Sequence, residues 1–295
     1  MIAPALLNEF VDRVNEVSDF CELLALSDSS IVCIWGAAGI GKSALLARLI
    51  QECEHRGVRA VETEWRDSRR YSYLDLMRRI RDRTRPELFY PFNDRVNFYT
   101  APEYRLHLQV ETGTIEHVQV TTGNVDSGTV NVHVGHQIEI KDFMLNVLRP
   151  DQVASDDTVS IELTNTFFLC LRQYATSNKT VLLFDALEKA DPRTLDWLVG
   201  ELLTRLRDGE LPNTLIVLAG RDPLELDGSF FAVQRIFQLS AFGAQHVSEY
   251  LERKGLPDGG LLAAFLAQQF QGNPLQISSA VNGFLRSHAR GAANV

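Results

Sequence analysis

The segment GAAGIGKS, residues 36–43, places the tightest constraint on what this 295-residue chain can fold into. It follows the apolar run IVCIW and precedes ALLARLIQECE, which favours a helix. Glycines allow a backbone turn in which successive N–H groups point inward, and the N-terminus of the following helix adds partial positive charge. With its lysine and serine, the segment matches the G-x-x-x-x-G-K-[ST] pattern. The sequence therefore predicts a phosphate-binding loop (P-loop) between a buried strand and a helix.

The predicted ligand of this loop is a nucleoside triphosphate. The ammonium group of Lys42 is suited to the β- and γ-phosphates, and the hydroxyl of Ser43 can ligate Mg²⁺. Expected cofactors are therefore ATP or ADP with Mg²⁺. The residues expected to contact the nucleotide here are Gly36, Ala37, Ala38, Gly39, Ile40, Gly41, Lys42, Ser43 and Ala44.

The rest of the chain alternates strand and helix patterns. Short runs rich in valine, isoleucine and leucine predict strands at 31–35, 59–64, 180–184, 214–219 and 235–239. Helical patterns lie at 42–55, 73–84, 158–176 and 192–207. This alternation predicts an α/β fold, a P-loop NTPase parallel sheet flanked by helices. Beyond residue 243 only helical patterns follow, at 244–254, 259–270 and 275–286, which indicates a small C-terminal helical subdomain.

Residues 88–142 interrupt this alternation. From Tyr104 onward, apolar and polar residues alternate with period two between the turn sequences TGT, TGN and DSG, which predicts a β-hairpin or meander insertion. The predicted domains are thus 1–87 and 143–242 for the two parts of the NTPase core, 88–142 for the insertion and 243–295 for the helical subdomain. The histidines of the insertion (His107, His117, His133 and His136) have no acidic or cysteine partners that complete a metal site, so no metal is expected there.

A P-loop needs a second magnesium ligand from the end of another buried strand. Asp185 directly follows the apolar run TVLLF, and we predict that it serves as this carboxylate. Glu188, three residues further on, could orient or deprotonate the attacking water; a solvated charge near a helix cap is the other interpretation. Arg221 follows strand 214–219, at the same sheet edge, where it could sense the γ-phosphate. An ion pair with Asp222 or Glu225 is the alternative.

Together these segments resemble the STAND class of P-loop ATPases, which includes the NACHT and NB-ARC proteins. FVDRVNEVSDFCELL, residues 10–24, is similar to the class's hxGRxxE segment, with Val11, Arg13 and Glu16 matching. LLFDALEKAD is similar to its hhhhDxxDE strand end, and Arg221 matches its sensor-1 arginine. QGNPLQI is similar to its GxP motif, with Gly272 and Pro274 matching. The resemblance implies that Val11, Arg13 and Pro274 lie near the adenine.

The resemblance also implies a function, namely a signal-transduction switch. Bound ATP, hydrolysed slowly, would control conformation or oligomeric assembly, in defence or regulatory signalling, with a protein partner or self-assembly following from it. Alternatives are a P-loop kinase or other NTPase that acts on a small acceptor, an AAA+-type or RecA-type nucleic-acid motor, and a binding module in which nucleotide is only structural support.

Charge and cysteine usage bear on partners and compartment. The formal net charge is −9, from which nucleic acid is expected to be an unlikely partner. No apolar stretch approaches the about 18 residues that span a bilayer, and the N-terminal segment does not resemble a signal peptide, so no membrane association is expected. The four cysteines (Cys21, Cys33, Cys53 and Cys170) show neither CxxC nor metal-ligand spacing. A reducing, cytoplasmic location is the resulting expectation.

Overall fold

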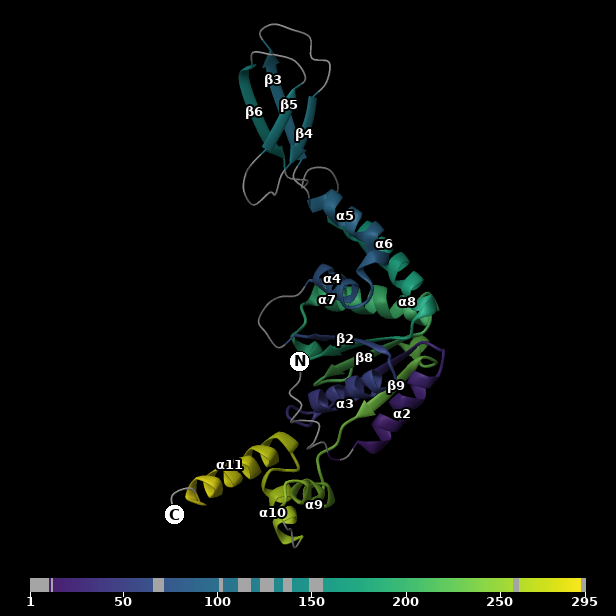
Figure 1. Ribbon diagram of the computed structural model, residues 1–295. Coiled ribbons are helices and arrows are strands. Elements are labelled where there is room, and N and C mark those ends of the chain that lie inside the picture. Colours follow the sequence, from purple (N-terminus) through teal and green to yellow (C-terminus); the bar gives the residue numbers. More distant parts are fainter. Residues whose placement is uncertain are drawn as a thin grey trace. The chain divides into compact units, whose positions relative to one another are not determined.

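The computed structural model describes residues 11, 13–65, 72–100, 103–110, 118–122, 130–134, 140–148, 156–256 and 260–292 (Figure 1). Between residues 103 and 148 the description covers the backbone only. The chain forms two compact units. The first combines Met1–Pro91 with Thr164–Val295, and the second is Phe92–Leu163. The domain boundaries expected from the sequence stay predictions.

A five-stranded sheet forms the centre of the first unit, in the order β2-β7-β8-β1-β9. All four neighbouring pairs are parallel. The strands are β1 (Ser30–Trp35), β2 (Arg59–Glu64), β7 (Thr180–Asp185), β8 (Thr214–Gly220) and β9 (Gln234–Gln238). Each agrees with a predicted strand to within one residue at either end. Because β8 lies between β1 and β7, the segments that follow these three strands meet at one edge of the sheet.

Helices cover both faces of this sheet (Figure 1). On one face lie α2 (Val14–Ala25) and α3 (Lys42–His55), and on the other α4 (Tyr73–Arg83), α7 (Pro192–Trp197) and α8 (Thr204–Arg207). Short helical turns span Pro86–Phe89, Leu187–Lys189 and Gly228–Phe230. The predicted fold class, a P-loop NTPase sheet flanked by helices, is confirmed. Within the described residues, no helix combines the length and apolar character that a bilayer span requires.

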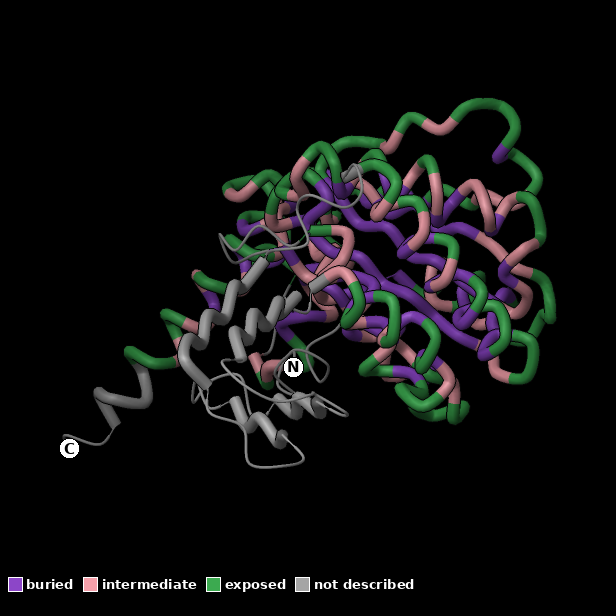
Figure 2. Tube along the Cα trace, turned by 90° about the horizontal axis from the view of Figure 1, so that it is seen from above, coloured by how far each residue is buried: buried purple, intermediate pink, exposed green. Residues whose placement is uncertain are grey.

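The core on the α2 and α3 face is closely packed. Side chains of α2 and α3, such as Phe20, Leu45 and Leu49, are buried against Val32 of β1 and Val217 of β8. Figure 2 shows buried residues following the strands while the outer helix faces are exposed. Strand β7 is buried at all six positions, as expected for a central parallel strand covered on both faces.

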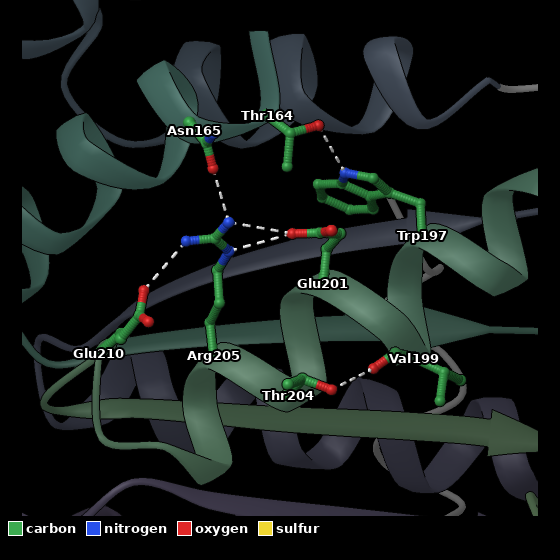
Figure 3. A network of polar contacts seen from close by, with 8 residues as sticks. All are labelled: Thr164, Asn165, Trp197, Val199, Glu201, Thr204, Arg205 and Glu210. Carbon is green, nitrogen blue, oxygen red and sulfur yellow. Dashed lines mark hydrogen bonds and ion pairs between the residues drawn. The ribbon is translucent and has the colours of Figure 1, made fainter. Parts of the chain in front are cut away.

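On the opposite face, Arg205 of α8 joins several elements (Figure 3). Its guanidinium group donates to Glu201 at 3.0 Å, to Glu210 at 3.0 Å and to Asn165 of α6 (Asp156–Ser177) at 2.7 Å. It also lies 4.7 Å from the ring centroid of Phe168. Between α7 and α8 the backbone forms a π-helix, Leu198–Leu203, where the sequence predicted one continuous α-helix.

Next to this network, a buried tryptophan connects α7 with α6. The Nε1 of Trp197 donates to the Thr164 hydroxyl at 3.1 Å, and both side chains are buried (Figure 3). The rings of Trp197 and Phe168 stack with centroids 5.6 Å apart.

A second, smaller core belongs to the C-terminal helices. These are α9 (Ala244–Arg253), α10 (Leu261–Gln269) and α11 (Pro274–Ala292). Val247, Leu251, Ala263 and Ile277 pack together in it, and Val11 from the N-terminal end of the chain is buried among them. Val11 therefore contributes to the core of the helical subdomain, whereas Phe20 of α2 contributes to the core of the sheet.

The second unit contains two antiparallel strand pairs. Strand β3 (Glu103–Val110) pairs with β6 (Ile140–Leu148), and β4 (Val118–Thr122) with β5 (Val130–Val134). The period-two pattern therefore predicted the strand type. However, α5 (Tyr90–Thr100) is helical where the sequence analysis began the insertion. Pro91 lies in the first turn of this helix, a position where proline is tolerated. His117 and His136 lie outside the described residues, as do the side chains of His107 and His133.

Candidate phosphate-binding site

The loop between β1 and α3 contains left-handed backbone conformations at two of its glycines. Gly39 and Gly41 have φ values of 77° and 101°, and α3 begins at Lys42. A side chain in this left-handed region would be strained. The Nζ of Lys42 donates to the carbonyl oxygens of Gly36 at 2.6 Å and Ala37 at 3.0 Å. The Lys42 ammonium group thus lies against the loop, in a position from which it would contact a bound phosphate.

The first turn of α3 contacts the end of β7. The Ser43 hydroxyl donates to Oδ2 of Asp185 at 2.7 Å, and Asp185 is 4% exposed. Since α3 follows β1 and Asp185 ends β7, the contact joins segments 142 positions apart. Ala44, the next residue of α3, is half-buried. A hydroxyl and a carboxylate at this distance are the hard oxygen donors that suit Mg²⁺.

Two further charged residues lie at the same sheet edge. The carboxylate of Glu188 pairs with Nε of Arg221 at 3.1 Å. The ion pair considered for Arg221 therefore exists, but its partner is Glu188 and neither Asp222 nor Glu225. Burial lowers the pKa of Lys42 from its ordinary value of 10.5, while the carboxylates of Glu188 and Asp185 act in the opposite direction. Lys42 is therefore close enough to both to interact electrostatically.

Arg13 contacts the linker between the sheet and the helical subdomain. Arg13 is buried, and its guanidinium group donates to the carbonyl oxygen of Ser240 at 2.5 Å. It also lies 5.6 Å from the ring centroid of Phe242. Arg13 has a left-handed backbone, with φ of 69°, directly before α2. Arg13 thus lies where the sheet joins the C-terminal helices, and Val11 packs among those helices.

The start of α11 touches the P-loop. The side-chain amide of Asn273 donates to the carbonyl oxygen of Ala38 at 3.0 Å, and the backbone N–H of Leu275 donates to that of Gly39 at 3.2 Å. Pro274 lies between them as the first residue of α11. The sequence analysis selected Pro274 and missed Asn273, although Asn273 belongs to the same GNPL sequence.

The structure therefore brings most of the sequence-predicted residues into two groups. Lys42, Ser43, Asp185, Glu188 and Arg221 lie together at the phosphate end. Val11, Arg13 and Pro274 lie at the junction with the helical subdomain. The roles of all these residues stay predictions. No cluster of three or more histidine, cysteine or acidic side chains arranged for a metal occurs in the described part of the chain.

Comparison with known proteins identifies the family. The model of the AAA ATPase domain matches residues 9–217. None of the curated protein sequences compared with the chain matches it. Among solved structures, Cdc6p from Pyrobaculum aerophilum is similar, with a TM-score of 0.53 and 13% identity over 99% of this chain and 67% of that one. This similarity supports the fold.

Two further solved structures have TM-scores just under 0.5 and belong to longer chains. The Aeropyrum pernix Orc1 protein in complex with DNA has a TM-score of 0.48 and 15% identity over 94% of this chain. A STAND protein with a tetratricopeptide repeat sensor from Pyrococcus horikoshii has a TM-score of 0.49 and 14% identity over 93% of this chain. This chain spans 60% of the length of the first and 31% of the second.

The expectation that nucleic acid is an unlikely partner is wrong. Similar structures include the Orc1 protein in complex with DNA and the replication initiator DnaA bound to single-stranded DNA. Net charge is a sum over the whole surface, whereas contact with DNA requires only a local group of cations. A value of −9 therefore does not exclude such contact.

The family model covers most of the chain and includes both the P-loop and Asp185. The parallel sheet places that loop and that carboxylate in contact. This chain belongs to the AAA ATPase domain family of nucleotide-binding P-loop ATPases.

Proposed function

We propose that this chain is an ATP-binding, slowly hydrolysing switch of the STAND kind, related to NACHT and NB-ARC domains. The observation that carries the proposal is the 2.7 Å contact between Ser43 and Asp185. This contact joins the end of the P-loop to the carboxylate of β7, and a hydroxyl and a carboxylate are oxygen donors of the kind that Mg²⁺ prefers. Bound Mg²⁺ would bridge phosphate oxygens and neutralise charge that develops there.

Of the charged residues, Lys42 and Arg221 would bind phosphate and Glu188 would act in hydrolysis. Lys42 would exchange its bonds to the Gly36 and Ala37 carbonyls for phosphate oxygens. Glu188 and Arg221 form an ion pair, so the γ-phosphate would compete with the Glu188 carboxylate for the Arg221 guanidinium group. Once released, the Glu188 carboxylate could orient or deprotonate the attacking water. ADP has no γ-phosphate and would leave the pair in place.

The switch would act through the helical subdomain. A ligand shifts a conformational equilibrium only through unequal affinity for the two states. A nucleotide bound between the P-loop and the residues around Arg13 and Pro274 would contact both sides of that junction. Its γ-phosphate would then decide between conformations or assemblies, with a protein partner or self-assembly reading the outcome in defence or regulatory signalling. The cytoplasmic location stays a prediction.

Two measurements test this proposal. Lys42→Ala should abolish binding of a fluorescent ATP analogue while the protein stays folded by circular dichroism. Retained tight binding would overturn the site assignment. Light scattering of the wild type in ADP and in a non-hydrolysable ATP analogue should give different masses or hydrodynamic radii. Identical values would reject the switch while leaving nucleotide binding intact.

An AAA+-type ATPase that works on nucleic acid is the second candidate, because the family match covers residues 9–217. Five arginines lie within Arg78–Arg85, on α4 and just after it, and supply a local group of cations. Arg81 is paired with Asp82 at 2.7 Å, so part of this charge is neutralised. Stimulation of ATP turnover by single-stranded or duplex DNA would favour this candidate. Turnover that is independent of DNA would favour the switch.

A further inference from the structure

We propose that Asn273 is a positioning residue for the P-loop: its side chain holds the loop carbonyls on the side of α11 and so directs the loop amides toward phosphate. This inference rests on the proposed nucleotide site and adds a residue to it. The helical subdomain would then shape the phosphate cradle directly, in addition to any contact that it makes with nucleotide.

The Asn273 amide makes contacts in two directions. Its Oδ1 accepts from the backbone N–H groups of Leu275 at 3.1 Å and Gln276 at 3.3 Å, which caps the start of α11. Its Nδ2 donates to the carbonyl oxygen of Ala38 at 3.0 Å. One side chain therefore both begins the helix and fastens it to the P-loop.

The geometry of the peptide unit makes this contact important for the loop. In a planar trans peptide, the C=O and the N–H point in opposite directions. Asn273 holds the Ala38 carbonyl and the Leu275 N–H holds the Gly39 carbonyl. The amides of Gly39 and Ile40, which belong to the same two peptide units, therefore point away from α11. These are loop amides that the sequence analysis assigned to phosphate. The Ile40 N–H donates to the Ala37 carbonyl within the loop at 3.3 Å, a bond that phosphate would have to replace.

Gly39 is fitted to this contact as well. A Cβ at Gly39 would lie 2.8 Å from Oδ1 of Asn273 and 3.1 Å from Cβ of Leu275. A Cβ at Gly41 would meet nothing within 4 Å. The two glycines thus differ. Both have a left-handed backbone, but only at Gly39 would a side chain also collide with the start of α11.

The test separates helix capping from loop positioning. Asn273→Asp keeps an acceptor oxygen for the Leu275 and Gln276 N–H groups but replaces the donor that faces the Ala38 carbonyl. Asn273→Ser also keeps a capping hydroxyl, on a side chain shorter than asparagine. Ser278→Ala is the matched control, because it removes a hydrogen bond within α11, from Ser278 Oγ to the Leu275 carbonyl, without touching the loop.

The first readout is hydrogen exchange of nucleotide-free protein, which does not depend on any ligand. We expect Asn273→Asp and Asn273→Ser to speed exchange in peptides covering residues 36–41, with thermal stability close to that of the wild type. The second readout is the dissociation rate of a fluorescent ADP analogue. For Asn273→Ser, loss of one neutral hydrogen bond predicts an increase of about 2- to 10-fold. Asn273→Asp also adds a negative charge near the loop, so its dissociation rate should rise at least as much, and Asn273→Ser is the decisive variant for this readout. Ser278→Ala should leave both values unchanged.

Each result decides the inference. Wild-type exchange and dissociation in Asn273→Asp and Asn273→Ser would overturn it and leave Asn273 as a helix cap. An equal effect of Ser278→Ala would also overturn it, since the disturbance would then be general to α11. If the wild type binds no ADP analogue, the proposed function fails, and hydrogen exchange alone still decides whether Asn273 positions the loop.

Discussion

The ion pair between Glu188 and Arg221 gives a quantitative test of how ATP would be told from ADP. We consider Arg221→Met, which keeps much of the side-chain length and removes the charge. The Arg221 side chain is 55% exposed and that of Glu188 is 24% exposed. Ion pairs at such exposure contribute about 0–1 kcal/mol to folding. The free energy of unfolding should therefore fall by less than about 1 kcal/mol, and Tm by no more than about 2–4 °C.

The effect on nucleotide preference should be larger. A charge-assisted hydrogen bond from Arg221 to the γ-phosphate is worth about 1.5–3 kcal/mol. Breaking the pair with Glu188 costs up to about 1 kcal/mol of this. The difference is about 0.5–3 kcal/mol. The middle of this range, about 1–2 kcal/mol, means that Arg221→Met should bind ATP roughly 5- to 30-fold more weakly than the wild type. Affinity for ADP, which has no γ-phosphate, should hardly change.

Calorimetric titration with ADP and with a non-hydrolysable ATP analogue, both with Mg²⁺, measures the two affinities. Arg235→Met is the control, because Arg235 is an exposed arginine of β9. Glu188→Gln adds a second check: because it removes the competitor for Arg221, it should tighten ATP binding more in the wild type than in Arg221→Met, where only its repulsion of phosphate is relieved. An equal loss for ADP and ATP, or an unchanged ratio, would refute the sensor role of Arg221.

Three further predictions concern other contacts. Asp185→Asn keeps an acceptor for the Ser43 hydroxyl and removes the charge, so nucleotide affinity should become insensitive to magnesium chelation. Burial lowers the pKa of Lys42, so its protonated form costs folding free energy below that pKa, and this cost is relieved as pH rises from the lowered pKa to the ordinary value of 10.5. The lysine also loses its charge in this pH range, so ADP affinity should fall before pH 10.5. Lys42→Arg should show no such fall. Trp197→Phe leaves the Thr164 hydroxyl unpaired and should cost about 1–3 kcal/mol in denaturant unfolding, with nucleotide affinity unchanged.

The elements that the sequence predicted best are those with strong local signals. Apolar runs bounded by polar residues located all five strands of the sheet, since a central parallel strand is buried on both faces. The P-loop was equally clear because its glycines, lysine and serine are required together. Asp185 was recognisable as the polar residue that ends an apolar strand; it contacts Ser43, and its role as a magnesium ligand stays a prediction.

Features that depend on distant segments were beyond the sequence. The partner of Arg221 could not be chosen from nearby acids, because Glu188 comes from a different strand end. The burial of Val11 among the C-terminal helices depends on how those helices pack. The helix Tyr90–Thr100 carries a proline and several aromatic residues, which weaken its helical signal. The contact of Asn273 with Ala38 spans 235 positions and needs both the loop and the subdomain in place.

The contacts at the junction also limit how strongly nucleotide could act on it. Asn273 and Leu275 supply hydrogen bonds to the loop, and the N–H of Phe242 donates to the Gly272 carbonyl at 2.8 Å. Each bond is worth about 1 kcal/mol net. A γ-phosphate contact worth about 1–2 kcal/mol net is comparable with one or two of these hydrogen bonds. It is small compared with the free energy gained by packing the core beneath α2 and α3. Nucleotide identity could therefore shift the junction between docked and undocked forms while the sheet stays intact, and a switch in this chain would have to operate there.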